Sequence, residues 1–377
     1  MNKILLFASC LVFTAIGYTQ TTVTSSFEFD GVEREYKLYI PEIYDGSEPA
    51  PLVFNLHGYG SNNNEQEAYG DFRPIADTAN FIIVLPMGLV DDLGSTHWNT
   101  FGTSSVDDVG FLSALIDTVY AGYNIDGNRI YSTGMSNGGF MSYKLACLLS
   151  GRIAAIASVT GAMTPVEFDA CITNHPMPVM EIHGTADETV PYEGNLFFMA
   201  SEDIVDHWVT FNECDSEPVV TEVPDTDTDD GCTATHYVYE NGLLGSTVEL
   251  YKINDGAHTW PGSAYVTGTT NNDFSASQEI WRFFSKYTLN HLTSGIETNA
   301  APVEFMMYPN PSNQAQVTLS FADNLEKTIT VHNSLGQVVL ETTKALSTVQ
   351  LDIEDEGIFF VTINQNGAIH TEKLVRN

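Results

Sequence analysis

Short apolar runs of the kind that form buried β-strands alternate with helical patterns along this chain up to about residue 290. The clearest run is Phe81–Leu85, in which every residue is apolar and which therefore suits a strand buried on both faces. Alternating strands and helices predict an α/β fold with a mostly parallel central sheet, since parallel neighbours are joined by helical crossovers. The other predicted strands are Tyr36–Ile40, Leu52–Leu56, Arg129–Thr133, Ile153–Val159, Val179–Ile182 and Val248–Ile253, and the predicted helices are Val109–Ala121, Gly138–Leu149, Asn195–Phe211 and Ser275–Leu289.

The pattern changes after residue 292. Residues 293–302 are mostly small and polar, which is typical of a linker. Residues 303–377 contain short alternating segments separated by turn residues, and this pattern predicts a small all-β sandwich. We therefore predict two domains, at residues 21–292 and 303–377, as the length of 377 residues also favours.

The first twenty residues have the pattern of an export signal peptide. Lys3 supplies a positive charge, and Ile4–Gly17 is mostly apolar but too short to span a membrane. Cleavage near Gln20 fits this pattern. The alternative is a lipoprotein signal acylated at Cys10, but little apolar sequence precedes that residue. Elsewhere the sequence contains no apolar stretch of transmembrane length, so we expect a soluble, exported protein.

The charge of the chain argues against two classes of partner. It has 14 Lys+Arg against 49 Asp+Glu, which gives a formal net charge of -35. Binding to nucleic acid requires a basic face that can contact phosphates, so we expect no nucleic-acid partner. Docking on anionic lipid is disfavoured for the same reason.

Four cysteines remain after the predicted signal peptide. Export would place Cys147, Cys171, Cys214 and Cys232 in an oxidising compartment, and their even number fits two disulfide bonds. Three pairings are possible, of which the pairing of sequence neighbours is Cys147–Cys171 with Cys214–Cys232. A zinc site is the alternative, but the sequence has no CxxC spacing, and we expect no metal.

An acidic segment, Pro224–Gly231 (PDTDTDDG), has some likeness to a calcium-binding loop. Its glycine falls one position late for an EF-hand, and position twelve is His236 instead of a glutamate. A solvated acidic loop is the reading that we prefer.

The segment Gly134-Met135-Ser136-Asn137-Gly138 is a GxSxG motif between a predicted strand and a predicted helix. A sharp strand-to-helix turn requires small residues on both sides of the serine, because the turn is tight and strained. The turn would present the Ser136 hydroxyl at the N-terminus of the helix, where free amides favour developing negative charge. Ser136 is therefore the predicted nucleophile.

A serine nucleophile needs a base, and the partners of such a strand–turn–helix serine follow it in the order acid, then histidine. His258 lies in a loop directly after the predicted strand Val248–Ile253, where open α/β sheets carry their ligand chemistry. Asp187 follows the strand Val179–Ile182 in the same way and is the predicted acid. The other candidates are His175, His183, His207 and His236 for the base and Glu188 and Asp255 for the acid.

Hydrolysis through a tetrahedral intermediate also needs two backbone N–H donors, an oxyanion hole. The N–H of Asn137 directly follows the nucleophile, and the N–H of Tyr59, with Gly58 as the alternative, lies in the loop after Leu52–Leu56. Trp98 and Trp260 lie in loops and could line an aromatic substrate cleft. Plain packing is the competing interpretation for both.

In order along the chain stand the motifs LHGYGSNN, WNT followed by DDVGFLSALID, YNIDGNRIYSTGMSNGGFMSYKLAC, AAIASVTGAM, EIHGTADETVPY and ELYKINDGAHTWPG. Over residues 25–290 these motifs resemble the polyhydroxybutyrate depolymerase and feruloyl esterase family of α/β-hydrolases. The resemblance implies carboxylic ester hydrolysis without a cofactor, with Ser136, Asp187 and His258 as the triad. It also implies a disulfide between Cys147 and Cys171. Many relatives have further cysteines near the Trp98 loop, which this chain lacks, so substrate preference transfers weakly.

The C-terminal segment contains Tyr308-Pro309-Asn310-Pro311, then Leu335–Val338, then Gly357–Val361 and the end Lys373–Asn377. With these motifs it resembles a type A sorting domain of the type IX secretion system. It implies passage across the outer membrane by the type IX machinery, followed by release or attachment at the cell surface. A carbohydrate-binding or adhesive β-domain is the alternative.

The sequence thus predicts a secreted serine carboxylesterase, with feruloyl or related polysaccharide esters as its substrates. The alternatives are an extracellular polyhydroxyalkanoate depolymerase, a peptidase of the same fold, and a non-catalytic binding protein on a hydrolase scaffold.

Overall fold

The computed structural model describes residues 21–102, 104–265, 268–293, 305–333, 338–365 and 368–376. The chain divides into two compact units, with the division between Thr293 and Ser294, and each unit has its own hydrophobic core. The predicted signal peptide, residues 1–20, and all but the first residue of the predicted linker lie outside the described residues.

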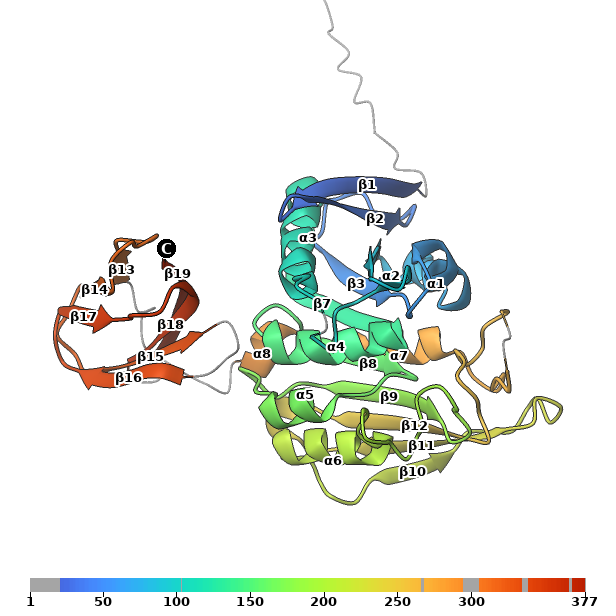
Figure 1. The fold of residues 1–377 in the computed structure, drawn as a ribbon. Helices are drawn as coiled ribbons and strands as arrows, with labels where there is room; N and C mark the ends of the chain where they lie inside the picture. The colour runs from blue at the N-terminus through green and yellow to red at the C-terminus, as the bar shows by residue number, and fades with distance from the viewer. Residues whose placement is uncertain are drawn as a thin grey trace, which may run out of the picture. The chain divides into compact units, whose positions relative to one another are not determined.

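The first unit is built on a ten-stranded sheet with the order β1-β2-β4-β3-β7-β8-β9-β12-β11-β10 (Figure 1). From β4 to β12 neighbouring strands pair in parallel. At the edges the pairs are antiparallel: β2 with β4 and β1 with β2 on one side, and β11 with β12 and β10 with β11 on the other. The strands are β1 Thr21–Phe29, β2 Val32–Ile40, β3 Ala50–Leu56, β4 Ile82–Pro86, β7 Ile125–Met135, β8 Ala155–Val159, β9 Val179–Gly184, β10 Val219–Glu222, β11 Thr233–Tyr239 and β12 Val248–Asn254, and a small separate hairpin pairs β5 Leu89–Val90 with β6 Thr96–His97.

The central strands are buried on both faces, as the apolar runs predict. In β4, successive side chains alternate between two cores: Ile82 and Val84 pack into one, Ile83 and Leu85 into the other. This alternation follows from the two-residue period of a strand. The sheet therefore separates two apolar layers, each of which must be covered by helices.

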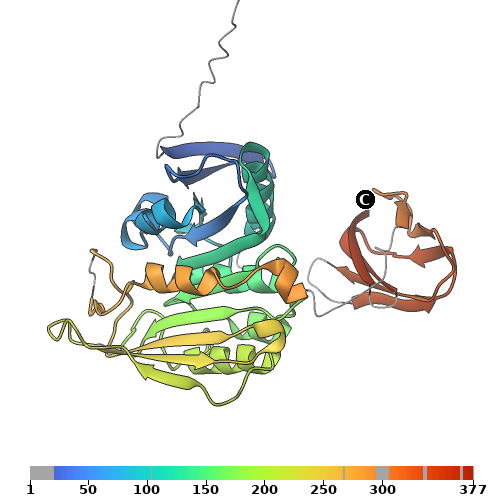
Figure 2. The ribbon, with the colours of Figure 1, turned by 180° about the vertical axis from the view of Figure 1, so that it is seen from behind.

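Helices cover both faces of this sheet. Side chains of α3, α4 and α6 pack into one core, and side chains of α2, α7 and α8 pack into the other. Figure 1 shows α4 and α6 in front of the sheet, and Figure 2 shows α7 in front of it from the opposite side. The predicted mostly parallel sheet with helices on both faces is thus confirmed. The helices are α1 Asn63–Tyr69, α2 Arg73–Ala79, α3 Asp108–Gly122, α4 Asn137–Leu148, α5 Pro165–Ala170, α6 Ser201–Phe211, α7 Ala276–Phe284 and α8 Leu289–Thr293.

Two predicted helices are shorter than the sequence pattern indicates. The segment before α6 does not join the helix, because the side chain of Asn195 accepts hydrogen bonds from the N–H groups of Phe197 and Phe198 and holds a turn. The last predicted helix ends at Phe284 because the chain turns to bury Tyr287. The carbonyl of Tyr287 accepts a hydrogen bond from the Tyr131 hydroxyl at 2.7 Å.

The second unit consists of two antiparallel sheets, with the orders β13-β14-β17 and β16-β15-β18-β19. Their inward-facing side chains, among them Leu319, Val331 and Val361, form one core. The predicted all-β organisation of this segment is confirmed. The strands are β13 Phe305–Tyr308, β14 Gln316–Phe321, β15 Lys327–Asn333, β16 Val338–Lys344, β17 Thr348–Asp352, β18 Gly357–Gln365 and β19 Ala368–Arg376.

Candidate active site

Ser136 lies at the sharp turn between β7 and α4. Its backbone has φ 55° and ψ -121°, a conformation that residues other than glycine seldom adopt. The turn is held by a hydrogen bond from the N–H of Ser136 to the carbonyl of Val159, at 2.8 Å. A Cβ atom added at Gly138 would lie 2.1 Å from the carbonyl oxygen of Leu56, and one added at Gly134 would lie 2.5 Å from the same oxygen. The two glycines of the GxSxG motif are thus required because the turn packs directly against β3.

Asp187 and His258 contact each other at the carboxyl ends of the neighbouring parallel strands β9 and β12. Nδ1 of His258 lies 2.6 Å from Oδ2 of Asp187. The other carboxylate oxygen accepts hydrogen bonds from the N–H groups of Thr189 and Val190, both at 2.8 Å. The side chain of Asp187 is fully buried, whereas that of His258 is 19% exposed. The carboxylate is therefore fixed, and the imidazole that it orients remains accessible.

The environment of Asp187 keeps it ionised. Burial acts to raise the pKa of Asp187, but hydrogen bonds from His183 and His258 outweigh burial and hold that pKa well below its usual range. A buried carboxylate that stays charged can stabilise positive charge on the imidazole that it contacts.

The loops that carry Asp187 and His258 are packed together. The N–H of Ala186 donates to the carbonyl of Gly256 at 2.9 Å. A Cβ at Gly184 would lie only 2.2 Å from the same carbonyl oxygen. The two loops can therefore approach this closely only because residue 184 has no side chain.

Trp260 anchors the far end of the loop that follows β12. Its ring packs against Tyr69 and Phe72, with centroids 6.4 and 6.2 Å away, at the end of α1 and the start of α2. Helix α1 contacts β3, which β7, β8 and β9 separate from β12 in the sheet. The chain from β12 to Trp260 therefore crosses the carboxyl ends of these strands. This path carries His258 toward the end of β7, where Ser136 lies.

The loop after β3 lies against the turn of the nucleophile. A Cβ at Gly58 would be 3.4 Å from the Cβ of Ser136. His57 fixes this loop: its Nε2 accepts the N–H of Gly88 at 3.0 Å, so the ring proton is on Nδ1, 2.8 Å from the carbonyl of Gly58. Burial lowers the pKa of His57, which favours this neutral form.

Asn137, the first residue of α4, holds a second loop beside the nucleophile. Its Oδ1 accepts the N–H of Trp98 at 2.6 Å, and its Nδ2 donates to Oγ1 of Thr100 at 2.9 Å. Its own N–H belongs to the first helical turn, where N–H groups have no intrahelical acceptor. The predicted oxyanion donors, the N–H groups of Asn137 and Tyr59, thus come from two segments that flank Ser136, and their role stays a prediction.

Trp98 and Trp260 do not line a substrate cleft. Their exposed fractions are 0% and 3%, so the prediction that they contact substrate is wrong. Nε1 of Trp98 donates to the carbonyl of His57 at 2.9 Å, and its ring packs against the ring of that histidine at 5.0 Å. Both indole rings pack and anchor the loops around the site because those loops need an apolar interior of their own.

Sequence reasoning missed a group of aromatic rings that begins next to Thr100 and includes two exposed side chains. Phe101 is 47% exposed and directly follows Thr100, the residue that Asn137 holds. Its ring lies 6.1 Å from that of Phe198, whose neighbour Phe197 is 70% exposed. The signal in the sequence was a pair of phenylalanines inside a turn-forming segment, Asn195-Leu196-Phe197-Phe198.

The other candidates for the base and the acid are engaged elsewhere or point to solvent. His183 is fully buried and contacts the same oxygen of Asp187 that His258 contacts. Glu188 and Asp255 are exposed. The remaining histidines pair with other groups, His175 with the carbonyls of Ser150 and Pro176, His207 with the ring of Phe168, and His236 with Glu249.

The predicted Cys147–Cys171 disulfide is confirmed. It joins the last turn of α4 to the end of α5, with a sequence separation of 24 residues. The helix that begins at the nucleophile is thereby fastened at its other end.

The predicted Cys214–Cys232 disulfide is wrong, because both residues are free thiols. The N–H of Asp215 bonds to the carbonyl of Glu240, just after the end of β11, whereas Cys232 directly precedes the start of the same strand. A seven-residue strand spans about 24 Å, and a disulfide requires Cα atoms within about 7 Å of each other.

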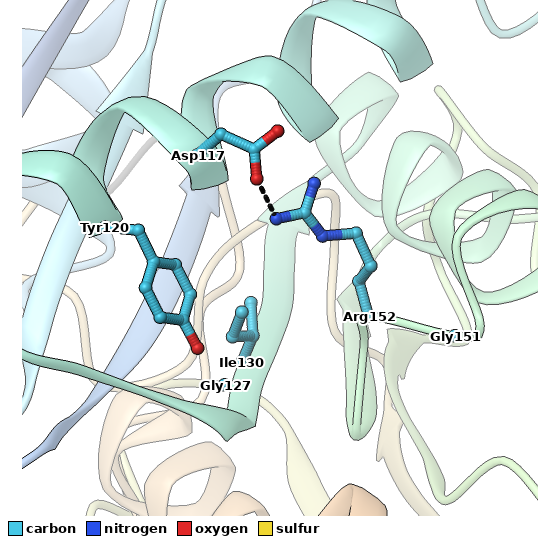
Figure 3. A pocket seen from close by; sticks show the side chains of 6 residues that line it. All are labelled: Asp117, Tyr120, Gly127, Ile130, Gly151 and Arg152. Atoms are coloured by element: carbon cyan, nitrogen blue, oxygen red, sulfur yellow. Dashed lines mark hydrogen bonds and ion pairs between the residues drawn. The ribbon is translucent and has the colours of Figure 1, made fainter. Parts of the chain in front are cut away.

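A hollow in the first unit lies away from these residues (Figure 3). It borders the early part of β7, at Gly127 and Ile130, whereas Ser136 follows the last residue of that strand. Its charged groups, Arg152 and Asp117, are paired with each other. We assign no function to it. Within the described residues, no group of three or more His, Cys, Asp or Glu side chains is arranged to hold a metal ion, and no helix is long and apolar enough to cross a membrane.

Two family models match the chain. Residues 34–193 match the family described as esterase PHB depolymerase, and residues 306–377 match the secretion system C-terminal sorting domain. The predicted resemblances to an esterase family and to a sorting domain are thus confirmed, each over the residues that match.

Among curated proteins, the chain is similar to feruloyl and acetylxylan esterases. It is 28% identical over 278 residues to feruloyl esterase D of Neurospora crassa, covering 71% of this chain and 86% of that protein. It is 27% identical over 260 residues to a bifunctional acetylxylan esterase/xylanase of Neocallimastix patriciarum, covering 69% of this chain but only about a third (34%) of that longer protein. These relatives are carboxylic ester hydrolases, the enzyme class that the sequence predicts.

Solved structures agree on the fold. An acetyl xylan esterase from Aspergillus awamori superposes with a TM-score of 0.51 at 12% identity, over 70% of this chain and 99% of that one. A thermostable esterase superposes with a TM-score of 0.50 at 18% identity, over 71% of this chain and 63% of that one. The predicted α/β-hydrolase fold is confirmed.

Proposed function

Because the chain carries an esterase PHB depolymerase domain, we propose that it is a secreted serine carboxylesterase that acts through an acyl-enzyme. The observation that supports this most directly is the 2.6 Å contact between Asp187 and His258 at the strand ends beside the strained turn of Ser136. A binding protein would not require a nucleophile in a strained turn together with an oriented histidine.

In the proposed mechanism, Oγ of Ser136 attacks the ester carbonyl carbon while His258 accepts its proton. Asp187 stabilises the resulting imidazolium, and the N–H groups of Asn137 and Tyr59 bind the oxyanion of the tetrahedral intermediate. The intermediate collapses to the acyl-enzyme, and the leaving alcohol takes the proton from His258. Water, deprotonated by His258, then attacks the acyl carbonyl, and collapse of the second intermediate returns the proton to Ser136 and releases the acid.

We propose feruloyl or related polysaccharide esters as the substrates. The named feruloyl esterases among the relatives support this class, and so do the exposed rings of Phe101 and Phe197, which could stack on an aromatic acyl group. The second candidate is a polyhydroxyalkanoate depolymerase, which the name of the matching family favours. Both candidates use the same chemistry and differ in what the surface around the site binds.

The sorting domain at residues 306–377 supports a route out of the cell. We propose export with the aid of an N-terminal signal peptide and then type IX transport, with the protein finally released or attached to the outer cell surface. The type IX secretion machinery is thus the proposed protein partner.

Product release from methyl ferulate and from amorphous polyhydroxybutyrate, measured side by side, tests the proposal. The protein would be the chain from residue 21 onward, with Ser136→Ala as the control. Ferulate release that disappears in the control supports the feruloyl esterase, and hydroxybutyrate release that disappears identifies a depolymerase. Cleavage of a simple acetyl ester alone keeps the esterase and excludes both named substrates. No turnover of any ester, or equal turnover in the control, overturns the serine mechanism.

A further inference from the structure

Behind Asp187, away from His258, a row of buried polar side chains extends into the protein. Nε2 of His183 lies 3.3 Å from the Asp187 oxygen that His258 contacts. Nδ1 of His183 lies 2.8 Å from Oε1 of Glu181, and Oε2 of Glu181 accepts the hydroxyl of Tyr143 at 2.7 Å. The side chains of Glu181, His183 and Asp187 are all 0% exposed. A row of alternating carboxylates and imidazoles thus runs from α4 to the surface.

The contacts of His183 determine how many protons it carries. Its Nε2 faces the carbonyl oxygen of Val190 at 2.8 Å in addition to the Asp187 carboxylate. Its Nδ1 faces the Glu181 carboxylate and, at 3.1 Å, the hydroxyl of Ser201. If Glu181 is ionised, a neutral imidazole would turn a bare nitrogen lone pair toward the Val190 carbonyl or toward the Glu181 carboxylate, neither of which can donate. With Glu181 ionised, His183 therefore carries a proton on each nitrogen and is a cation.

We propose that Glu181 and His183 are positioning residues of the triad: Glu181 keeps His183 doubly protonated, and the His183 cation fixes and charge-balances Asp187. This inference rests on the proposed function, in which Asp187 orients His258. With His258 neutral, the buried groups Glu181, His183 and Asp187 sum to one negative charge. When His258 takes the serine proton, the whole row becomes neutral, which suits a site that excludes water.

The electrostatics of the row agree with this assignment. Burial acts to lower the pKa of His183, but hydrogen bonds to Asp187 and Glu181 outweigh burial and raise that pKa to about 10. Burial raises the pKa of Glu181, and hydrogen bonds from His183 and Tyr143 act against burial. The pair shares one proton between two buried groups, and we assign it to His183 because Glu181 also accepts a hydrogen bond from the Tyr143 hydroxyl, which favours the ionised carboxylate.

The charged pair beside His183, Glu202 with Lys252, carries no net charge. The ring of Tyr192 packs edge-on against His183, with centroids 5.8 Å apart, and its hydroxyl donates to Glu202 of α6. Glu202 also pairs with Lys252 of β12 at 2.8 Å. This ion pair adds no net charge, so the field at Asp187 depends on the two histidines that contact it and on Glu181.

His183→Gln tests the proposal, because the glutamine amide reaches the position of Nε2 and retains a donor while losing the charge. The His183 nitrogen and the His258 nitrogen contact the same oxygen at 3.3 and 2.6 Å, so they are less than 6 Å apart. The variant thus removes a positive charge close to the proposed base. The midpoint of the acid limb of kcat/KM should therefore move to higher pH by about one to two units. The alkaline plateau should fall by no more than about tenfold.

The matched control is His175→Gln. His175 is 3% exposed, and its two nitrogens also face carbonyl oxygens, those of Pro176 and Ser150. Both ring nitrogens of His175 are thus engaged by backbone carbonyls outside the triad, so this variant should affect stability alone. Phenyl acetate hydrolysis across the pH range, with thermal unfolding of each variant, gives both readouts. An unchanged acid limb in His183→Gln, with only a uniform fall in rate, would show that His183 is merely structural.

Glu181→Gln is the second variant, which keeps the proposal testable if His183→Gln does not fold. A glutamine amide can donate to Nδ1, so His183 loses its second proton and the acid limb should move in the same direction by a smaller amount. A shift to lower pH, or no shift, would overturn the role given to Glu181. The Ser136→Ala variant separates the two proposals. If it still hydrolyses the ester, the proposed function fails. If it does not, and neither His183→Gln nor Glu181→Gln shifts the acid limb of kcat/KM, only this inference fails.

Discussion

Gly184→Ala should disable hydrolysis while the fold remains. A Cβ at residue 184 would lie 2.2 Å from the carbonyl oxygen of Gly256, and real Cβ contacts essentially never fall below 3.0 Å. The loops that carry Asp187 and His258 must therefore separate by about 0.8 Å or more, which is enough to break a hydrogen bond of 2.6 Å. A misplacement of about 1 Å in a catalytic group costs on the order of 10²-fold in rate, so we expect kcat/KM to fall about a hundredfold.

Gly122→Ala is the matched control, because a Cβ there meets nothing within 4 Å. Neither glycine has a positive φ, so any difference arises from space instead of backbone strain. The assay is ester hydrolysis with circular dichroism and thermal unfolding of each variant. We expect Gly184→Ala to lose about 1–3 kcal/mol of stability from overpacking. A rate within about threefold of the wild type would refute the argument that close approach of the loops sets the geometry.

Two predictions concern stability. Removing the Cys147–Cys171 bond, whose residues are separated by 24 positions, should lower the free energy of unfolding by about 3.4 kcal/mol in a urea titration of the double alanine variant. A loss below about 1 kcal/mol would contradict the chain-entropy argument. Burial acts to raise the pKa of Glu249, but hydrogen bonds from His236 and Arg282 lower it to about 2. Because this folded-state pKa is below the unfolded value, Glu249 contributes about 3 kcal/mol that is present above about pH 5 and lost toward pH 2. Urea midpoints against pH should be flatter in Glu249→Gln, and parallel curves for the two proteins would exclude this contribution.

The parts of the fold and site that the sequence predicts correctly are those encoded locally. The run Phe81–Leu85 indicates a doubly buried strand because each face of β4 requires apolar side chains. Gly134 and Gly138 mark the turn of Ser136 because the backbone of β3 leaves no room for a side chain. Asp187 and His258 could be singled out because each directly follows a strand of the parallel sheet.

The parts that the sequence did not reveal depend on distance across the fold. Cys214 and Cys232 are near in sequence but lie at opposite ends of β11, whose pairing between β10 and β12 no local pattern indicated. Trp98 lies in a loop segment, yet it is buried because Asn137 and His57 draw that loop inward. The role of His183 likewise depends on Glu181 and Asp187 facing it from two sides, which no motif records.

The side chains proposed for catalysis and those around them differ in how freely they can vary. Gly184, Gly138 and the turn of Ser136 are confined by neighbouring backbone, so almost any replacement there would be selected against. Phe101 and Phe197 project from loops and are largely exposed. Mutation can therefore exchange them at little cost to folding, and if they bind the acyl group as proposed, the preferred ester changes with them. This separation lets descendants of one ancestral hydrolase diversify toward new polymers while inheriting an unchanged reaction centre.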